Sequence, residues 1–217
     1  MHIRPRPWAR PELEASPFFA AEPWTMKNHW RAGYPEPNRP LYLELGCGKG
    51  QFIAKLSAAH PENNYLAVDM IDTMLGLTRR NVVAERGGAD PDNLLITAWD
   101  ITRIDKILGP DDRIDGLYIN FCNPWPKRKK HKKRLTHTRQ LILYKAFLAP
   151  GAVLRFKTDD DDLFDDTLDY LKEAGFETET VIRNLHAHPM ADDYPTEHEK
   201  MFAEKGIPIK YLQARMI

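Results

Sequence analysis

Cysteine is scarce in this sequence, which holds only Cys47 and Cys122 among its 217 residues. Two cysteines do not make the disulfide framework of a small secreted domain. They also lack the paired spacing that marks a zinc site. We therefore expect neither a fold held by disulfides nor a bound metal ion.

Long apolar runs are missing as well, because none approaches the roughly 20 residues that a membrane-spanning helix needs. The first residues, MHIRPRPWARPELEASPFF, contain arginine and proline but no apolar segment of the kind found in secretory signals. The sequence therefore predicts a soluble, cytoplasmic protein.

An excess of charge of one sign is also absent, since 31 basic residues balance 31 acidic ones. The charges are nevertheless segregated along the chain. Seven of the eight residues from Lys127 to Arg134 are Lys or Arg, and six of the eight from 159 to 166 are Asp. A charge run is commonly a solvated surface. Both runs, however, directly follow predicted strands, where α/β proteins carry their functional loops.

Apolar strands and amphipathic helices alternate from Leu41 onward. We predict strands at 41–45, 64–70, 93–100, 114–121, 152–158, 176–185 and 209–216. The first five are largely apolar without alternation, which is typical of a parallel sheet covered on both faces. The last two alternate more, as an antiparallel pair at one edge would. The prediction is an α/β fold with a doubly wound, Rossmann-like sheet, mostly parallel, with an antiparallel C-terminal edge pair and helices on both faces.

Helices are expected between these strands, at 51–59, 71–86, 136–148, 162–175 and 196–206, with 149–151 closing the third of them. The chain then divides into an irregular arm at 1–40, rich in proline and tryptophan, and one main domain at 41–217. We expect the arm to pack on the main domain or to cover it.

A glycine turn follows the first predicted strand in LELGCGKG, with Gly46, Gly48 and Gly50 at every second position. Glycines there tolerate positive φ and let the backbone approach a ligand, and the next helix offers its free N–H groups. A dinucleotide fingerprint would read G-x-G-x-x-G, and this spacing differs. Taken alone the turn is a weak signal.

Acidic residues at three successive strand ends strengthen the indication of a ligand site at the glycine turn. Asp69 ends the second strand 23 residues after Gly46. A carboxylate at this position would accept hydrogen bonds from the ribose hydroxyls of a nucleoside. Trp99 and Asp100 end the third strand. Trp99 could offer an apolar surface to an adenine, and Asp100 could accept a hydrogen bond from its amino group. Glu44 precedes the glycines and would repel a pyrophosphate but suit a cationic sulfonium or amino acid. This favours S-adenosylmethionine over NAD, although Asp69 and Asp100 could simply cap turns.

Asn123, Pro124 and Trp125 follow the fourth strand, which in such a sheet lies beside the first, so they would face the methyl donor. The cations downstream of Trp125 can neutralise phosphates, and His131 and Trp125 offer flat surfaces for an unstacked base. Together these residues predict nucleic-acid binding.

Four stretches carry a family resemblance: LELGCGKGQF, YINFCNPWPKRKKHKKRLTH, RFKTDD and YPTEHEKMFAEKGIPIKYLQAR. With the N-terminal PWARPELEASPFF they resemble, in order and over nearly the whole chain, the bacterial tRNA (guanine-N7)-methyltransferases. The resemblance implies a class I S-adenosylmethionine-dependent fold that methylates N7 of a guanine in the tRNA variable loop.

The resemblance also implies residue roles. Glu44, Asp69 and Asp100 would hold the cofactor, and Lys127 and Asp159 would contact the substrate. The remaining carry-over is Lys129, Lys130, His131, Lys132, Lys133 and Arg134 for RNA, and Thr196, Glu197, His198 and Glu199 for the target guanosine. Thr196-x-x-Glu199 also fits a capping box. Asp159 is a candidate catalytic residue, and Asp160 to Asp162 are expected to cap or flank the next helix.

Asn123 departs from the family pattern, in which many members carry Asp at this position, so its catalytic and cofactor-binding roles are open. It partly matches the Asn/Asp-Pro-Pro-aromatic stretch of amino-group methyltransferases for adenine N6 or cytosine N4, but the second proline is missing. A non-catalytic RNA-binding module and a dinucleotide-dependent oxidoreductase are further alternatives. The sequence does not decide between a monomer and a homodimer.

Overall fold

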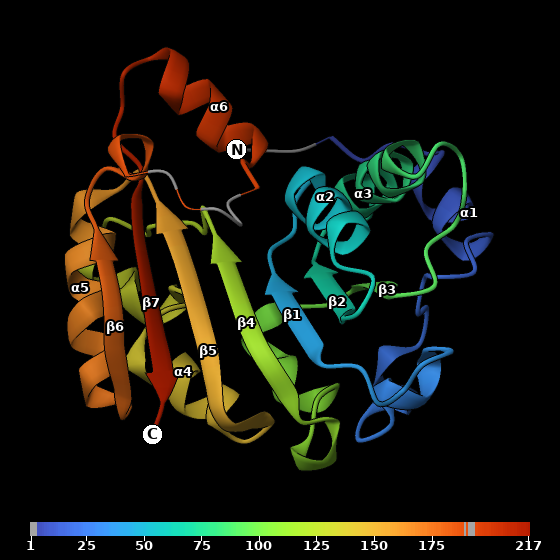
Figure 1. The fold of residues 1–217 in the computed structure, drawn as a ribbon, viewed down its shortest axis with the longest axis horizontal. Helices are drawn as coiled ribbons and strands as arrows, with labels where there is room; N and C mark the ends of the chain where they lie inside the picture. The colour runs from blue at the N-terminus through green and yellow to red at the C-terminus, as the bar shows by residue number, and fades with distance from the viewer. Residues whose placement is uncertain (1–3, 189, 191–193) are drawn as a thin grey trace.

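A seven-stranded sheet organises the part of the chain that the structure describes, with strand order β3-β2-β1-β4-β5-β7-β6 (Figure 1). The structure is a computed structural model, and it describes residues 4–188, 190 and 194–217. The strands are β1 (Leu41–Leu45), β2 (Asn64–Asp69), β3 (Leu94–Ala98), β4 (Ile114–Asn120), β5 (Leu148–Thr158), β6 (Phe176–Ile182) and β7 (Lys210–Met216). The first five are parallel, whereas β7 is antiparallel to both β5 and β6. The predicted fold class, including the antiparallel edge pair, is confirmed.

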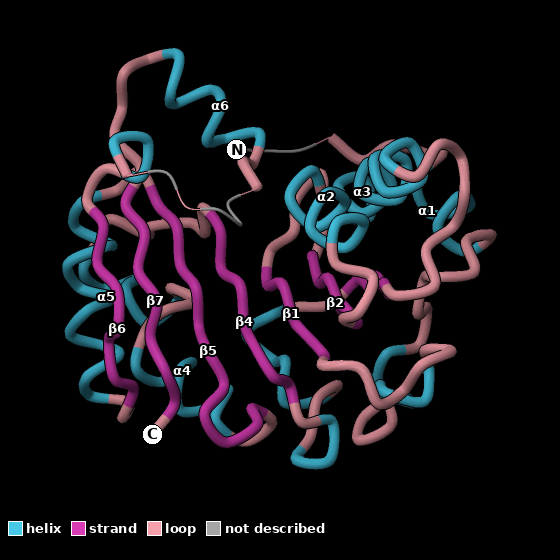
Figure 2. Tube along the Cα trace, in the orientation of Figure 1, coloured by secondary structure: helices cyan, strands magenta, loops and turns pink. Residues whose placement is uncertain are grey.

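Helices cover both faces of the sheet. The elements are α1 (Ala9–Glu14), α2 (Gln51–Ala59), α3 (Asp72–Glu85), α4 (Thr138–Lys145), α5 (Asp161–Glu173) and α6 (Glu197–Glu204). Period-two alternation divides β1 between two cores, because its side chains point to opposite faces. Leu41, Leu43 and Leu45 join the larger core under α4 and α5, and Tyr42 packs toward the core of α2 and α3. Figure 2 shows α6 beyond the carboxyl ends of the parallel strands, where ligands are expected.

Some element boundaries differ from the sequence prediction. The helix expected over 136–148 is confined to α4, and residues 149–151 do not close it. They belong to β5, whose pairing with β4 shifts register between Ile114 and Gly116. Such a bulge adds residues to one strand without ending it. A Pro-Gly pair in a bulge therefore resembles the end of a helix when only the sequence is known.

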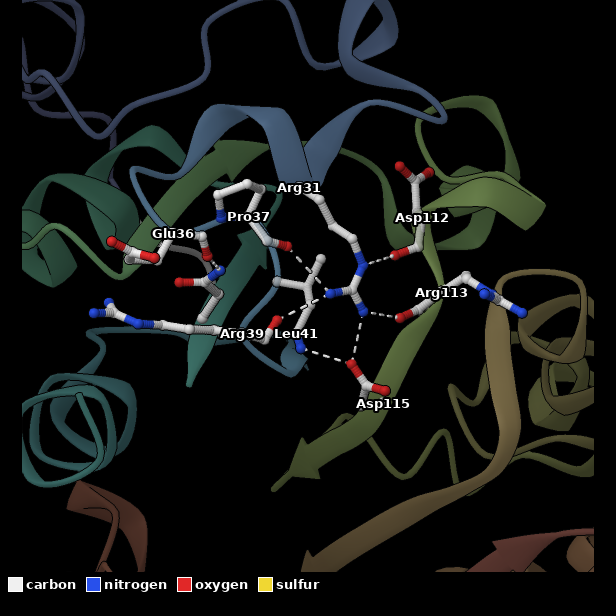
Figure 3. Close-up of polar contacts among 9 residues, drawn as sticks. Arg31, Glu36, Pro37, Arg39, Leu41, Asp112, Arg113 and Asp115 are labelled. Atoms are coloured by element: carbon white, nitrogen blue, oxygen red, sulfur yellow. Dashed lines mark hydrogen bonds and ion pairs between the residues drawn. The ribbon is translucent and has the colours of Figure 1, made fainter. Parts of the chain in front are cut away.

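The N-terminal arm is not wholly irregular, because it contains α1 and two 3₁₀ turns, η1 (Pro23–Met26) and η2 (Trp30–Gly33). Figure 3 shows how it is fixed at its end: the Arg31 guanidinium lies among the carbonyl oxygens of Asp112, Arg113 and Arg39 and the Asp115 carboxylate. Asp115 also accepts from the Leu41 N–H at the start of β1. One arginine thus joins the arm to the beginning of β1 and the turn before β4.

In the residues that the structure describes, no helix is both long and apolar enough to span a membrane. Within the same residues, no group of three or more His, Cys, Asp or Glu side chains is arranged to hold a metal ion.

Candidate active site

The glycine turn after β1 has the backbone conformation that its sequence suggests. Gly46, Gly48 and Gly50 all have positive φ, at 82°, 57° and 70°. A Cβ at Gly50 would lie 2.3 Å from the Thr78 side chain. Gly50 is also the N-cap of α2, with no side chain capping the free N–H groups. The turn therefore leaves backbone N–H donors at the carboxyl end of β1.

Glu44 lies beneath this turn and is only 2% exposed. Its Oε1 accepts a hydrogen bond from Asn120 Nδ2 at 3.1 Å, while its buried Oε2 has no partner among the described residues. Burial raises the pKa of Glu44 to about 7, with the Asn120 hydrogen bond opposing this and Asp69 adding to it. A buried carboxylate oxygen without a donor fits a cationic group such as the ammonium of an amino acid. The site residues therefore fit S-adenosylmethionine.

Asp69 and Asp100 cap turns, as the simpler interpretation of the sequence suggested. Asp69 accepts from the N–H of Gly48 at 2.9 Å and of Ile71 at 3.0 Å, and burial raises its pKa against these hydrogen bonds. Asp100 accepts from the Thr102 N–H at 3.0 Å and hydroxyl at 2.7 Å. A carboxylate has about four lone-pair sites, so a capping carboxylate can also accept from a ligand.

Trp99 has a restrained side chain. Its indole N–H donates to the Arg103 carbonyl at 2.9 Å, and its ring lies 6.2 Å from that of Trp24 in the arm. The arm therefore contributes an aromatic side chain beside the end of β3, which sequence reasoning did not identify.

The loop after β4 is locally strained, because Phe121 and Trp125 have φ of 52° and 45°, a region that side chains with Cβ atoms rarely adopt. The exposed Asn123 accepts from the Trp125 N–H through Oδ1 at 3.0 Å, which leaves its amide N–H₂ as the donor. Phe121 stacks on His198 of α6 at 5.7 Å between ring centroids. These contacts bring α6 beside the loop that carries Asn123.

The first turn of α6 has the capping box that the sequence predicted: Thr196 Oγ1 accepts from the Glu199 N–H, and Glu199 Oε2 accepts from the Thr196 N–H. Glu199 is buried and its Oε2 lies 3.1 Å from Lys157 Nζ. Glu197 is half-exposed and pairs with Lys49 of the glycine turn at 2.8 Å. The structure thus brings the segment predicted to bind guanosine next to the turn predicted to bind the cofactor.

Asp159 lies at the carboxyl end of β5, and Lys210 Nζ donates to its backbone carbonyl at 2.9 Å. The next residue, Asp160, is the N-cap of α5 and accepts from the Leu163 N–H at 2.7 Å. Asp161 and Asp162 lie in the first turn of α5, so the expectation that Asp160 to Asp162 cap or flank this helix is confirmed.

The basic block after β4 does not present all its cations to solvent. Four lysines are exposed on the 3₁₀ segment η5 (Arg128–Lys133), and we name them the exposed lysines: Lys129, Lys130, Lys132 and Lys133. Two of them lie over the Trp125 ring, at 5.4 Å for Lys130 and 5.1 Å for Lys133. Lys127 is exposed as well.

Arg134 and His131, in contrast, turn inward. Arg134 is 1% exposed, forms an ion pair with Asp166 of α5, and donates to the Pro124 carbonyl at 2.6 Å. His131 lies 3.1 Å from an Arg134 nitrogen. Arg134 therefore links this loop to α5 in the structure, and its contact with RNA stays a prediction. It was grouped with the lysines by charge, although an arginine can serve as a buried bridge between a loop and a helix.

A cavity of about 440 Å³ lies between α2 and the sheet face of β4, β5 and β7. Asn120 and Lys157 line it together with Tyr118, Arg155 and Tyr211. Sequence reasoning missed this cavity and the buried Lys157. The available signal was the alternation of polar and apolar residues in RFKT, which places Arg155 and Lys157 on one face.

Known proteins give a consistent picture. The family described as "Putative methyltransferase" matches residues 38–212. A tRNA (guanine-N(7)-)-methyltransferase of Clostridium perfringens (strain SM101 / Type A) is 46% identical, with 100% of both chains covered. One from Ruminiclostridium cellulolyticum is 48% identical over 99% of this chain and 92% of its own. The solved 16S rRNA methyltransferase KamB has a TM-score of 0.62 at 15% identity, covering 86% of this chain and 90% of its own, which shows a shared fold.

Proposed function

The chain belongs to the tRNA (guanine-N7)-methyltransferase family, and we propose that it transfers a methyl group from S-adenosylmethionine to N7 of a guanine in the variable loop of tRNA. The observation that supports this best is the buried Glu44 at the glycine turn, one of whose oxygens has no partner among the described residues. It lies one strand away from the Asn123 loop and the exposed lysines. A site for a cationic cofactor and a surface for a polyanion are therefore adjacent.

The cofactor-binding residues have divided roles in this proposal. Glu44 would accept from the ammonium group, Asp69 from the ribose hydroxyls, and Asp100 with Trp99 would border the adenine. Gly46, Gly48 and Gly50 would let the backbone approach closely. When bound, S-adenosylmethionine supplies an electrophilic methyl group on a sulfonium.

The acceptor atom needs positioning more than activation. N7 of guanine has a lone pair and no proton, so no general base is required at that atom. The residues of the chain would hold N7 of the base in line with the methyl group, and this orientation lowers the barrier to transfer. Asn123 would donate its amide N–H₂ to O6, and Asp159 would stabilise the positive charge that develops on the purine.

Substrate binding would divide between two surfaces. Lys127 and the exposed lysines would contact phosphates, and Trp125 would offer a ring to an unstacked base. Thr196, Glu197, His198 and Glu199 would bind the target guanosine. A tRNA substrate also implies a cytoplasmic protein.

The test is the identity of the product. Unmodified tRNA is incubated with the protein and labelled S-adenosylmethionine, digested to nucleosides, and separated. We expect label in 7-methylguanosine, mapped to the variable loop by reverse-transcription stops after borohydride and aniline treatment. Label in N6-methyladenosine or N4-methylcytidine would support the amino-group alternative, and no label would leave an RNA-binding module.

A further inference from the structure

Lys157 of β5 is a buried cation to which the proposed mechanism gives no role. It is 4% exposed, and its partner Glu199 is 2% exposed. Lysine and glutamate are rarely buried unless they are paired, because removing both charges from water is costly. A buried Lys–Glu pair beside a ligand site therefore indicates that the pair holds a neighbouring segment in position.

The pair joins two parts of the site that are far apart in the sequence. Lys157 is in register with Asn120 of β4, whose amide holds Glu44. The positive charge of Lys157 lowers the pKa of Glu44, against the effect of burial. The ammonium thus lies between the carboxylate proposed for the cofactor and the first turn of α6.

The contact also fixes the geometry of that turn. Lys157 Nζ and the Thr196 N–H both contact Glu199 Oε2, at 3.1 and 3.3 Å. Glu199 closes the capping box, so the turn cannot rotate without losing its cap or its contact with β5. The Lys49–Glu197 pair is a second connection, but its side chains are half-exposed and such pairs contribute little.

We propose that Lys157 is a positioning residue for the tRNA substrate. It holds the Glu199 carboxylate, and through it the Thr196–Glu199 turn, in place above the methyl-donor site. The inference rests on the proposed role of this turn in binding the target guanosine. It goes further by assigning the orientation of the turn to a residue of the sheet.

The test begins with Lys157→Met, which keeps the length of the side chain and removes the charge. We expect the KM for tRNA to rise by about tenfold or more, because the charge-assisted contact between Lys157 and Glu199 is lost. The dissociation constant of S-adenosylhomocysteine, measured at about pH 8.5 to keep Glu44 ionised, should change by less than about threefold. Lys157→Arg should recover most of the loss.

A double-mutant cycle separates positioning from general stability. Glu199→Gln retains the capping box and removes the charge. If Lys157 acts through Glu199, adding Lys157→Met to Glu199→Gln should change the KM by less than about twofold. Lys145→Met is the matched control, because the Lys145 ammonium donates to the Ala174 carbonyl away from the site. It should lower stability and leave the KM for tRNA unchanged.

Two results would overturn the proposal: additive effects of the two substitutions on KM, or a Lys157→Met protein with an unchanged KM. The wild-type protein is assayed first, so a lack of 7-methylguanosine would contradict the proposed function and not the role of Lys157. In that case the affinity for a variable-loop stem-loop is compared between the wild type and Lys157→Met, and equal affinities would refute the positioning role.

Discussion

The ionised Glu44 carboxylate should lower the free energy of unfolding and raise the affinity for the cofactor. The substitution Glu44→Gln separates these two effects. The pKa of Glu44 is raised from 4.5 to about 7 in the folded protein, so folding favours its protonated form. The unfolded chain releases this proton near pH 4.5 and the folded chain near pH 7. Stability therefore falls as the pH rises between these values and is constant above them.

The size of the effect follows from the pKa difference. At about 1.36 kcal/mol for each pKa unit, ionising Glu44 costs roughly 3 kcal/mol of folding free energy above pH 7. Gln can still accept from Asn120, but its amide N–H₂ would replace Oε2, which has no partner in the described part of the chain, at a cost of about 1 kcal/mol. We expect Glu44→Gln to be about 2 kcal/mol more stable than the wild type at pH 8 and slightly less stable at pH 5.

Cofactor affinity should change in the opposite direction. S-adenosylhomocysteine, which retains the ammonium group, should bind the wild type more tightly as the pH rises through about 7, because Glu44 ionises there. Glu44→Gln should bind it at least about tenfold more weakly at pH 8 and without this pH dependence.

Urea unfolding and calorimetric titration at both pH values measure the two quantities, and the exposed Glu22→Gln serves as the control. A Glu44→Gln protein that is less stable than the wild type at pH 8 would refute the argument that burial of this charge is uncompensated. Retained affinity would refute its role in holding the ammonium.

Four further predictions concern the other parts of the site. Asp69→Ala should weaken S-adenosylhomocysteine binding by about tenfold or more and leave RNA affinity unchanged in filter binding, and equal losses would contradict separate sites. Replacing the exposed lysines by Ala should lower RNA affinity and flatten its salt dependence, with stability unchanged. Arg134→Ala should instead lower the free energy of unfolding by about 2 kcal/mol or more, and an RNA defect without this loss would support a contact of Arg134 with RNA. Asn123→Asp should lower turnover by about tenfold or more, because Asp can still accept from the Trp125 N–H but cannot donate to O6, and turnover within about threefold of the wild type would contradict the role of the amide donor.

The sequence was sufficient for the parts of the structure that depend on local pattern. Apolar strands, the positive-φ glycine turn and the capping box at Thr196 each need particular residues at fixed spacing, and all three are present. The bulge in β5 was not predictable, because it depends on pairing with β4 and not on residues 149–151 alone.

Contacts between distant segments account for the other differences. Arg134 and the exposed lysines have the same charge in the sequence, and it is the contacts of Arg134 with Asp166 of α5 and with the Pro124 carbonyl that distinguish it in the structure. The same holds for Lys157, which resembles an ordinary strand residue until α6 places Glu199 beside it. Trp24 similarly reaches Trp99 only because the arm runs along β3.

The capping interactions also change how the acidic residues are interpreted. A cap and a ligand contact look like alternatives when only the sequence is known, and Asp69, Asp100 and Glu199 fit both. In the structure, backbone N–H groups hold each carboxylate in one orientation while it keeps further acceptor capacity. A carboxylate held in this way loses little rotamer entropy when a ligand binds, so the cap prepares the residue for binding. Glu44 differs because no backbone N–H holds its Oε2 among the described residues, and it is the acid for which the chain itself supplies the weakest compensation. The strongest dependence on the cofactor should therefore lie at Glu44 and not at the capped acids.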